Sequence, residues 1–357
     1  MKNILIFRTD RLGDYIIHSR PIYELKKKIT DCKIIIVCSV LNSKILKNSD
    51  YIDEIIVYDK NFSFLKKINI FFKLFKIKYY GIFALDNKKF TLFCNIFLIS
   101  KYKFGLAYKY QKKFINYLFI YFKPNKIYRS LFFNKISYFS SRKYLNKAES
   151  LCQKYLDLFN FFELQLTIND NYIFKTDLNA QKKFDELKLK FKINDYVLIH
   201  FDEKWLDFIN NNNELLNNIK ILQRKIEKKI ILTGYQNKFD YYNFLKNSIS
   251  YFDLISNKKN IKENTDILLL DNLDINIFER FIKNSFMNIS CHSGFVVQVC
   301  GANNGKIIDI IHERDQDWYK CWVPSMITYN VALKSTIKNG PNDINNIFSS
   351  IYGILNN

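Results

Sequence analysis

Short apolar runs alternate with longer stretches in which apolar residues recur at helical spacing. In the N-terminal half, the apolar runs predict strands at Ile4–Phe7, Lys33–Cys38, Glu54–Tyr58 and Gly81–Leu85. The helical spacing predicts helices at Asp14–Ile29, Ser43–Lys47 and Phe62–Ile77. This alternation is typical of a parallel sheet covered by helices on both faces.

The same alternation returns in the second half of the chain. Strands are predicted at Tyr196–Phe201, Lys229–Thr233, Ile267–Leu270, Phe286–Ile289 and Lys306–Ile311. Helices are predicted at Leu178–Phe191, Glu214–Ile226, Phe239–Ser248, Ile275–Asn284 and Asp343–Leu355. Residues 86–143 are harder to divide and read as mostly helical, with a short strand near Phe104, before a helix at Ser150–Phe159. A polar stretch, Leu164–Lys175, marks the junction between two α/β domains.

Charge is distributed unevenly along the 357 residues. The formal net charge is +21, and 48% of residues are hydrophobic, as in a globular protein. The abundance of Lys, Asn, Ile, Phe and Tyr is typical of AT-rich codons, which does not explain where the charge lies. Residues 60–143 hold 19 Lys or Arg and one acidic residue, a net charge of +18, and the rest of the chain carries +3. This aromatic-rich segment could bind an anionic membrane, a phosphorylated glycolipid or nucleic acid, or be a solvated helical face.

Cysteine usage and hydropathy limit the class of protein further. The seven cysteines are scattered and form no CxxC pair, so neither a zinc site nor a disulfide framework is predicted, and a reducing compartment is expected. The longest apolar stretch, Phe90–Ile99, is too short to span a bilayer. Asp10 and Asp14 interrupt the N-terminal region, so no signal peptide is predicted.

The first predicted strand is followed by a loop rich in charge. The sequence Arg8-Thr9-Asp10-Arg11-Leu12-Gly13-Asp14 leads into the first helix. Gly13 would allow a tight turn, and the Asp14 carboxylate suits a helix N-terminus. An ordinary first β–α turn of a Rossmann-like domain has the same pattern.

Three later segments carry polar residues at predicted strand ends. His200 ends a strand and is followed by Lys204-Trp205; Gly234 ends the strand Ile231-Leu232-Thr233; and His292-Ser293-Gly294-Phe295 lies between a strand and a helix. The free N–H groups and positive dipole of a helix N-terminus suit a phosphate.

These segments, in this order, resemble glycosyltransferase family 9, the ADP-heptose:lipopolysaccharide heptosyltransferases, and the chain resembles a divergent member. His292 stands where the family usually has Asp, a His about four residues later is absent, and Tyr235–Lys238 lacks the family's acidic residue. The resemblance implies a GT-B architecture, an α/β fold of two Rossmann-like domains that face each other across a cleft. The acceptor domain would be residues 1–170 and the donor domain 171–340, with a helix in 341–357 that packs back on the N-terminal domain.

The resemblance also implies the chemistry. An inverting, metal-independent glycosyltransferase would move a sugar from a nucleotide-sugar donor to a lipid-linked or surface-polysaccharide acceptor, resembling the lipopolysaccharide core. Asp14 matches the catalytic base. Donor-binding positions would be Lys204, His200, His292, Ser293, Gly294 and Phe295. Acceptor or phosphate contacts would come from Arg8, Thr9, Arg11 and Gly13. Neither a metal site nor a cofactor is expected.

The expected partners are a nucleotide sugar, a phosphorylated glycolipid and, through residues 60–143, the anionic inner-membrane surface. The expected location is the cytoplasm, and peripheral attachment to the inner face of the plasma membrane is open. A catalytically silent glycosyltransferase-like protein that binds glycan or nucleotide is the main alternative. Nucleic-acid binding is not expected, because no helix-turn-helix, RNP or zinc-finger signature is present. A dinucleotide-dependent oxidoreductase is disfavoured because no GxGxxG follows a predicted strand.

Overall fold

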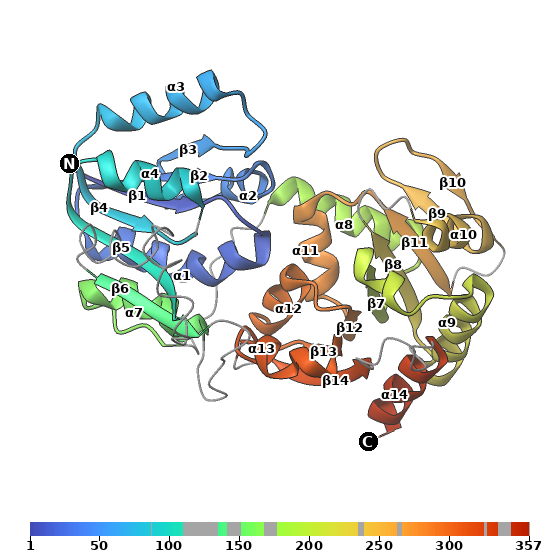
Figure 1. The fold of residues 1–357 in the computed structure, drawn as a ribbon. Helices are drawn as coiled ribbons and strands as arrows, with labels where there is room; N and C mark the ends of the chain where they lie inside the picture. The colour runs from blue at the N-terminus through green and yellow to red at the C-terminus, as the bar shows by residue number, and fades with distance from the viewer. Residues whose placement is uncertain are drawn as a thin grey trace. The chain divides into compact units, whose positions relative to one another are not determined.

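The computed structural model describes residues 1–86, 88–109, 135–140, 151–167, 177–234, 239–262, 266–324, 327–334 and 344–356. The chain divides into two compact units, Met1–Lys175 and Thr176–Asn357, each built on its own sheet (Figure 1). The domain junction expected at 170/171 falls in 168–176, outside the described residues.

The first domain is built on a fully parallel six-stranded sheet in the order β3-β2-β1-β4-β5-β6. Its strands are β1 (Lys2–Arg8), β2 (Cys32–Cys38), β3 (Glu54–Val57), β4 (Tyr79–Ala84), β5 (Ser100–Lys109) and β6 (Lys135–Ser140). Its helices are α1 (Leu12–Lys28), α2 (Val40–Leu46), α3 (Phe64–Phe75), α4 (Lys89–Phe97) and α7 (Leu151–Phe159), followed by the short 3-10 helix η2 (Asn160–Phe162). The strand order reverses between β1 and β4, and loops beyond the carboxyl ends of strands at such a point are where α/β sheets bind ligands.

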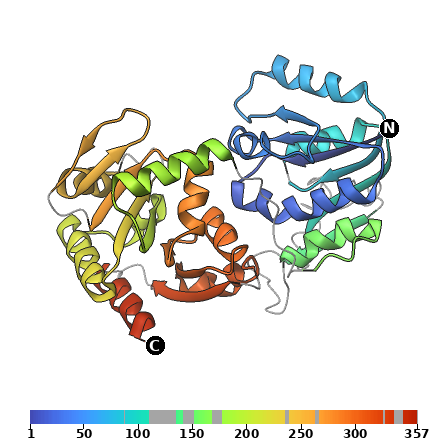
Figure 2. The same ribbon diagram turned by 180° about the vertical axis from the view of Figure 1, so that it is seen from behind.

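Helices cover both faces of this sheet (Figures 1 and 2). Successive side chains of β1 point to opposite faces, and the residues from Ile4 onward are all buried, so both faces must be covered. Leu5 and Phe7 pack with Leu74 of α3 and buried residues of α4 on one face. On the other face, Phe83 stacks on Phe159 of α7 at a centroid distance of 4.5 Å. The predicted parallel sheet with helices on both faces is therefore confirmed.

Residues 86–143 were expected to be mostly helical, and this expectation is wrong for most of their described part. The strand expected near Phe104 is confirmed but is longer than expected: after α4, the ten-residue strand β5 pairs with β4 and β6. The reason is a two-residue aromatic period at Tyr102 and Phe104, which suits a strand face: Phe104 is buried and stacks on Phe83 at 4.6 Å. Residues 110–134 lie outside the described residues.

The second domain has an eight-stranded sheet in the order β10-β9-β11-β8-β7-β12-β13-β14. Its strands are β7 (Tyr196–Phe201), β8 (Lys229–Gly234), β9 (Ser250–Asp253), β10 (Lys259–Asn260), β11 (Ile267–Asp271), β12 (Met287–Ser290), β13 (Lys306–His312) and β14 (Thr328–Lys334). Its helices are α8 (Leu178–Lys190), α9 (Asn212–Ile226), α10 (Asp240–Ser248), α11 (Ile275–Lys283), α12 (Gly294–Gly301), α13 (Gln316–Lys320) and α14 (Ile344–Asn356), with the 3-10 helices η3 (Glu203–Asp207) and η4 (Glu313–Asp315). Only the pairing of β10 with β9 is antiparallel among these strands, and the order reverses between β7 and β12.

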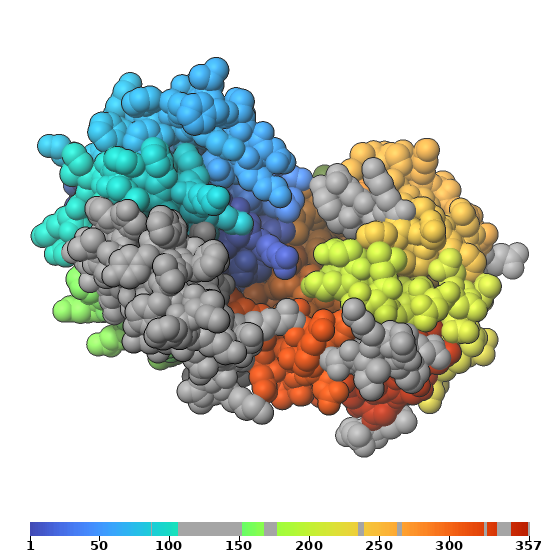
Figure 3. Space-filling model, in the orientation of Figure 1, coloured from blue at the N-terminus to red at the C-terminus, as the bar shows by residue number. Residues whose placement is uncertain are grey.

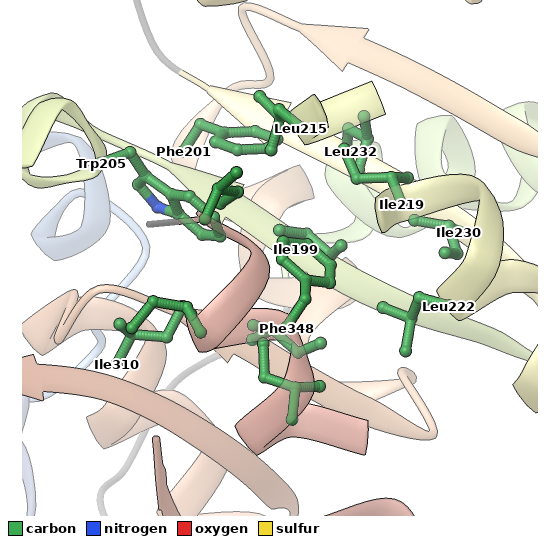
Figure 4. Packing of buried hydrophobic residues seen from close by; sticks show 14 of the residues in the cluster. Ile199, Phe201, Trp205, Leu215, Ile219, Leu222, Ile230, Leu232, Ile310 and Phe348 are labelled. Atoms are coloured by element: carbon green, nitrogen blue, oxygen red, sulfur yellow. The ribbon is translucent and has the colours of Figure 1, made fainter. Parts of the chain in front are cut away.

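The core of this domain joins β7 and β8 to α9, α10 and α14 (Figure 4). Helix α14 contributes an apolar stripe at helical spacing: Ile344, Ile347, Phe348 and Ile351 are buried, and the helix packs on α9 and β14. The apolar face of α14 therefore completes the core of the second domain, and the expectation that residues 341–357 pack back on the N-terminal domain stays a prediction.

We predict that Phe348→Ala lowers the free energy of unfolding of the second domain by about 3–5 kcal/mol, because a fully buried ring leaves a cavity. Urea unfolding followed by tryptophan fluorescence reports this domain alone, since Trp205, Trp318 and Trp322 all lie in it. The control Leu189→Ala removes a side chain that is 84% exposed and should cost no more than about 0.5 kcal/mol. An unmoved tryptophan transition in Phe348→Ala would contradict this packing.

Candidate active site

A buried arginine organises the loop beyond β1, at the reversal point of the first sheet. Arg8 has no exposed surface, and its Nη1 donates to the Leu85 carbonyl at the end of β4. Its Nε donates to the Asp14 carbonyl at 3.1 Å and lies 3.2 Å from Asp10 Oδ1. The guanidinium also lies over the Tyr155 ring, 5.1 Å from its centroid. Burial opposes the charge, but Asp10 and Asp14 outweigh it and raise the pKa of Arg8.

Asp14 lies in the first turn of α1, where a carboxylate is favoured by the helix dipole. Its Oδ1 is 3.7 Å from Arg8 Nη2, and its side chain keeps 28% of its surface exposed. His18 donates from Nδ1 to the Asp14 carbonyl at 2.7 Å, and burial lowers the pKa of His18, so the ring is neutral. Arg8 and His18 therefore hold the backbone carbonyl of Asp14, while its carboxylate stays partly exposed and can contact a ligand.

A second carboxylate shares this arginine. Burial raises the pKa of Asp10 to about 7, against the lowering effect of Arg8. Asp86, at the end of β4, accepts from the Thr9 backbone N–H at 2.8 Å and from Thr9 Oγ1 at 2.7 Å. The loop thus combines one buried cation with three carboxylates of different exposure.

The positions predicted to contact the acceptor do not behave alike. Arg8 is too deeply buried to meet a phosphate, so its predicted role as a direct contact is replaced by one in holding Asp14. The Thr9 N–H and hydroxyl both donate to Asp86. Arg11, in contrast, is exposed and is the N-cap residue of α1. Gly13 lies inside the first turn of α1 rather than in a turn before it, and no described glycine has a positive φ.

In the second domain, Lys204 ties together the carboxyl ends of β7 and β12. Register explains this contact, because His200 of β7 pairs with Ser290 of β12 and both chains leave the sheet at the same edge. Lys204 Nζ donates to the carbonyls of Cys291 at 3.0 Å and His292 at 2.7 Å. Lys204 thus lies beside the loop that enters α12, and its predicted contact with a donor phosphate stays a prediction.

After Cys291 the chain continues through His292 into the start of α12. His292 has a left-handed backbone, with φ 45°, and its N–H and Nδ1 lie 2.7 Å and 2.6 Å from the two oxygens of Asp309. Ser293 is the N-cap residue of α12 and makes no side-chain capping bond, Gly294 is exposed, and Phe295 is buried. The first N–H groups of a helix have no intrahelical partner, so this exposed end can accept an anion.

His200 is part of the packing beneath this edge. Its Nδ1 is 3.1 Å from Thr233 Oγ1, and its ring lies 4.7 Å from that of Phe278, which packs on Phe295. Burial lowers the pKa of His200 to about 3, with a smaller contribution from Lys204, so the ring is neutral. The half-buried His200 ring therefore packs beneath this edge as a neutral ring, and its predicted donor contact stays a prediction.

Several site residues were missed from the sequence. Asp86 could have been found because it follows the predicted strand Gly81–Leu85, whose end neighbours that of β1. Asp309 could have been found as a lone carboxylate in the apolar run Ile307–Ile311. Tyr155 and Tyr319 had no sequence signal, because only the folded chain brings them to Arg8 and His292.

Three further observations concern the described residues as a set. They contain no group of three His, Cys, Asp or Glu side chains placed to hold a metal ion. None of their helices is both long enough and apolar enough to pass through a bilayer. All seven cysteines are buried thiols.

Two Rossmann-like domains, each with polar groups at the reversal point of its sheet, define a GT-B fold. The structure is similar to a glycosyltransferase family 9 protein from Veillonella parvula, with 12% identity over 93% of this chain and 86% of that one and a TM-score of 0.68. It is also similar to the E. coli heptosyltransferase WaaC with ADP, with 12% identity over 99% of both chains and a TM-score of 0.63.

A UDP-GlcNAc 2-epimerase from Methanocaldococcus jannaschii is similar as well, with 13% identity over 100% of this chain and 93% of that one and a TM-score of 0.56. No family model matches the sequence, and no curated protein does. The predicted GT-B architecture and the resemblance to family 9 are confirmed in the fold. The fold alone does not choose between transfer and epimerisation.

We predict that the stability of the second domain falls as pH drops from about 6.5 toward 3, by at most about 1.4 kcal/mol per pH unit from His200. The folded pKa of His200, about 3, lies below the unfolded value, so acid protonates the unfolded chain first. Urea unfolding followed by tryptophan fluorescence should show this slope reduced in His200→Gln and retained in His312→Gln. Equal slopes in wild type and His200→Gln would show that His200 is not buried as a neutral ring.

Proposed function

We propose that this protein is an inverting, metal-independent glycosyltransferase that transfers a sugar from a nucleotide-sugar donor to a hydroxyl of a phosphorylated, lipid-linked glycan. The observation that carries the proposal is that each of the two domains of a GT-B fold offers one of the two features that sugar transfer needs. The first domain offers the partly exposed Asp14 carboxylate, and the second offers the exposed N-terminus of α12 beside Lys204. The similarity to family 9 structures, WaaC with ADP among them, supports this assignment.

In this proposal Asp14 is the general base. It takes the proton of the acceptor hydroxyl while the hydroxyl oxygen bonds to the anomeric carbon from the side opposite the leaving group. The bond from that carbon to the diphosphate oxygen breaks, so the configuration inverts and a nucleoside diphosphate leaves. Arg8 holds the Asp14 carboxylate from its buried side, with Nη2 3.7 Å from Asp14 Oδ1.

The donor diphosphate would bind at the N-terminus of α12. Backbone N–H groups of Gly294 and Phe295, the Ser293 hydroxyl and the Lys204 ammonium are the groups that would compensate its charge. Fixed donors of this kind stabilise a departing diphosphate without a divalent cation, which is the basis for proposing metal independence. Neither a cofactor nor nucleic acid enters the proposal.

The acceptor side is proposed to meet an anionic lipid surface. Here we define the α3–α4 surface as the exposed aromatic and aliphatic residues of α3 and α4, together with their lysines (Figure 3). These residues are Phe64, Leu65, Phe72, Phe75, Phe93 and Phe97, with Lys66, Lys67, Lys73 and Lys76. In α3 only Leu74 is buried. Exposed apolar side chains among lysines are typical of helices that lie in a membrane interface.

A catalytically silent protein that binds nucleotide or glycan is the second candidate. It is favoured by one observation, His292 at the position where the family usually has Asp. Turnover separates the two candidates, because a silent protein binds nucleotide without releasing nucleoside diphosphate from any nucleotide sugar.

We predict that Asp14→Asn lowers transfer by about 10²–10⁴-fold, because an amide cannot accept the acceptor proton. Release of nucleoside diphosphate from a panel of ADP-, UDP- and GDP-sugars, with lipopolysaccharide-core acceptors, measures this loss. Asp31→Asn, the same change at an exposed position, should keep full activity. Circular dichroism checks that both variants fold. Full activity of a folded Asp14→Asn variant removes Asp14 from the mechanism.

We predict that the protein floats with vesicles rich in phosphatidylglycerol, and that salt weakens this binding because the lysine contribution is screened. Phe64→Ser with Leu65→Ser should reduce flotation severalfold. The matched control is Leu178→Ser with Leu189→Ser, two equally exposed residues of α8, and should float like wild type. Flotation that ignores both salt and lipid charge would count against the α3–α4 surface.

A further inference from the structure

A buried carboxylate lies against the imidazole ring of His292. Asp309 has no exposed surface, and its Oδ2 lies 2.6 Å from His292 Nδ1 while its Oδ1 accepts from the His292 backbone N–H. Tyr329 donates its hydroxyl to the same Oδ2 at 2.7 Å. Tyr319 of α13 stacks on the ring, with a centroid distance of 3.7 Å. Contacts from β13 and α13 therefore hold the orientation of the ring.

The backbone at His292 is held in an uncommon conformation. Its φ of 45° is sparsely populated by residues other than glycine and persists only where the surroundings enforce it. Lys204 Nζ, which donates to the His292 carbonyl, and Asp309, which accepts from its N–H, fix both sides of the residue. The next two residues are Ser293 and Gly294, at the start of α12. The residue thus directly precedes, in the chain, the residues proposed to bind the diphosphate.

This arrangement has a chemical consequence for the ring. A carboxylate at Nδ1 keeps that nitrogen as the N–H donor and leaves Nε2 for a different partner. When the ring takes up a proton, Nε2 becomes a donor too, and the Asp309 carboxylate compensates the new positive charge. A diphosphate nearby favours the same charged form.

We propose that His292 is a proton-coupled anion-binding residue: it takes up a proton when a diphosphate binds at the N-terminus of α12, with Asp309 and Tyr319 as its positioning residues. The inference rests on the proposed donor site and adds to it the group that couples binding to pH. The proton comes from solvent when the diphosphate binds and returns to solvent when it leaves, so no further group has to donate or accept it.

The groups around the ring are compatible with this role. The titratable and charged contacts within the described residues are Asp309, Tyr329, Tyr319 and the Lys204 ammonium on the His292 carbonyl. Burial and the Asp309 carboxylate raise the pKa of Tyr329 above its ordinary value, so its hydroxyl remains a donor. Asp309 is then the negative partner of the ring, and the positive charge nearest the residue is the Lys204 ammonium on the His292 carbonyl, at 2.7 Å.

The direct test is a histidine titration by NMR with inorganic pyrophosphate, which represents the diphosphate of any donor. The chain has only four histidines, and the signal of His292 is the one missing from His292→Gln. Saturating pyrophosphate should move the His292 midpoint upward by about one pH unit, equivalent to binding about tenfold tighter below both midpoints than above them. An unmoved midpoint with pyrophosphate bound overturns the inference.

Calorimetry across the same pH range gives the second readout. Because pyrophosphate itself loses protons as pH rises, the comparison is with His292→Gln, in which the tenfold term should be absent. His312→Gln is the matched control, since His312 also contacts an aspartate, Asp207, at 3.1 Å, and it should keep the wild-type profile. Asp309→Asn should lose the coupling, and if that variant does not fold, Tyr329→Phe should weaken it.

The outcomes separate the inference from the proposed function. If ADP or UDP binds with the same pH profile in wild type and His292→Gln, the coupling is wrong while the donor site stands. If neither pyrophosphate nor any nucleoside diphosphate binds to the wild-type protein, the donor site itself is wrong, and the role of His292 falls with it.

Discussion

The parallel pairing of β7 with β12 is the constraint on which the candidate donor site depends. Register places His200 beside Ser290, so the two chains leave the sheet at the same level. Only then can the Lys204 ammonium reach the carbonyls of Cys291 and His292, and only then does α12 begin at the reversal point of the sheet. Asp309 joins from the next strand, because Ser290 pairs with it on the other side of β12. A shift of one residue in this register would point each of these side chains to the opposite face of the sheet.

In the first domain, a buried cation, Arg8, positions the candidate catalytic residue Asp14. Placing a guanidinium in a protein interior is costly unless carboxylates and carbonyls surround it, and Arg8 has Asp10, Asp14 and the Leu85 carbonyl as partners. These partners come from the loop after β1, the first turn of α1 and the end of β4. The arginine therefore ties the local geometry of Asp14 to the sheet beneath it. As in the second domain, the ends of two neighbouring strands, here β1 and β4, supply the groups that position a candidate site residue, Asp14.

Much of the architecture could be predicted from periodicity, and the exceptions have physical causes. The strands β1, β2, β7, β8 and β13 are continuous apolar runs because helices cover both faces of their sheets. The edge strand β14 escaped prediction because it pairs only with β13 and mixes polar with apolar residues. The side of the protein on which α14 packs could not be read from its own amphipathic pattern, which specifies a buried face without naming the partner. Asp14, Lys204 and Ser293-Gly294 were identified through the family resemblance, whereas the burial of Arg8 and the Asp309 contact depend on tertiary structure.

The left-handed backbone at His292 has a consequence for how proteins of this kind are recognised. Asp and His are both among the few residues that tolerate such a conformation, so the backbone alone does not select between them. One base change separates their codons. In this chain the carboxylate beside the His292 ring is that of Asp309, on the adjacent strand. Searches keyed to an acidic residue before Ser-Gly will overlook such chains, whereas a comparison of backbones will retrieve them.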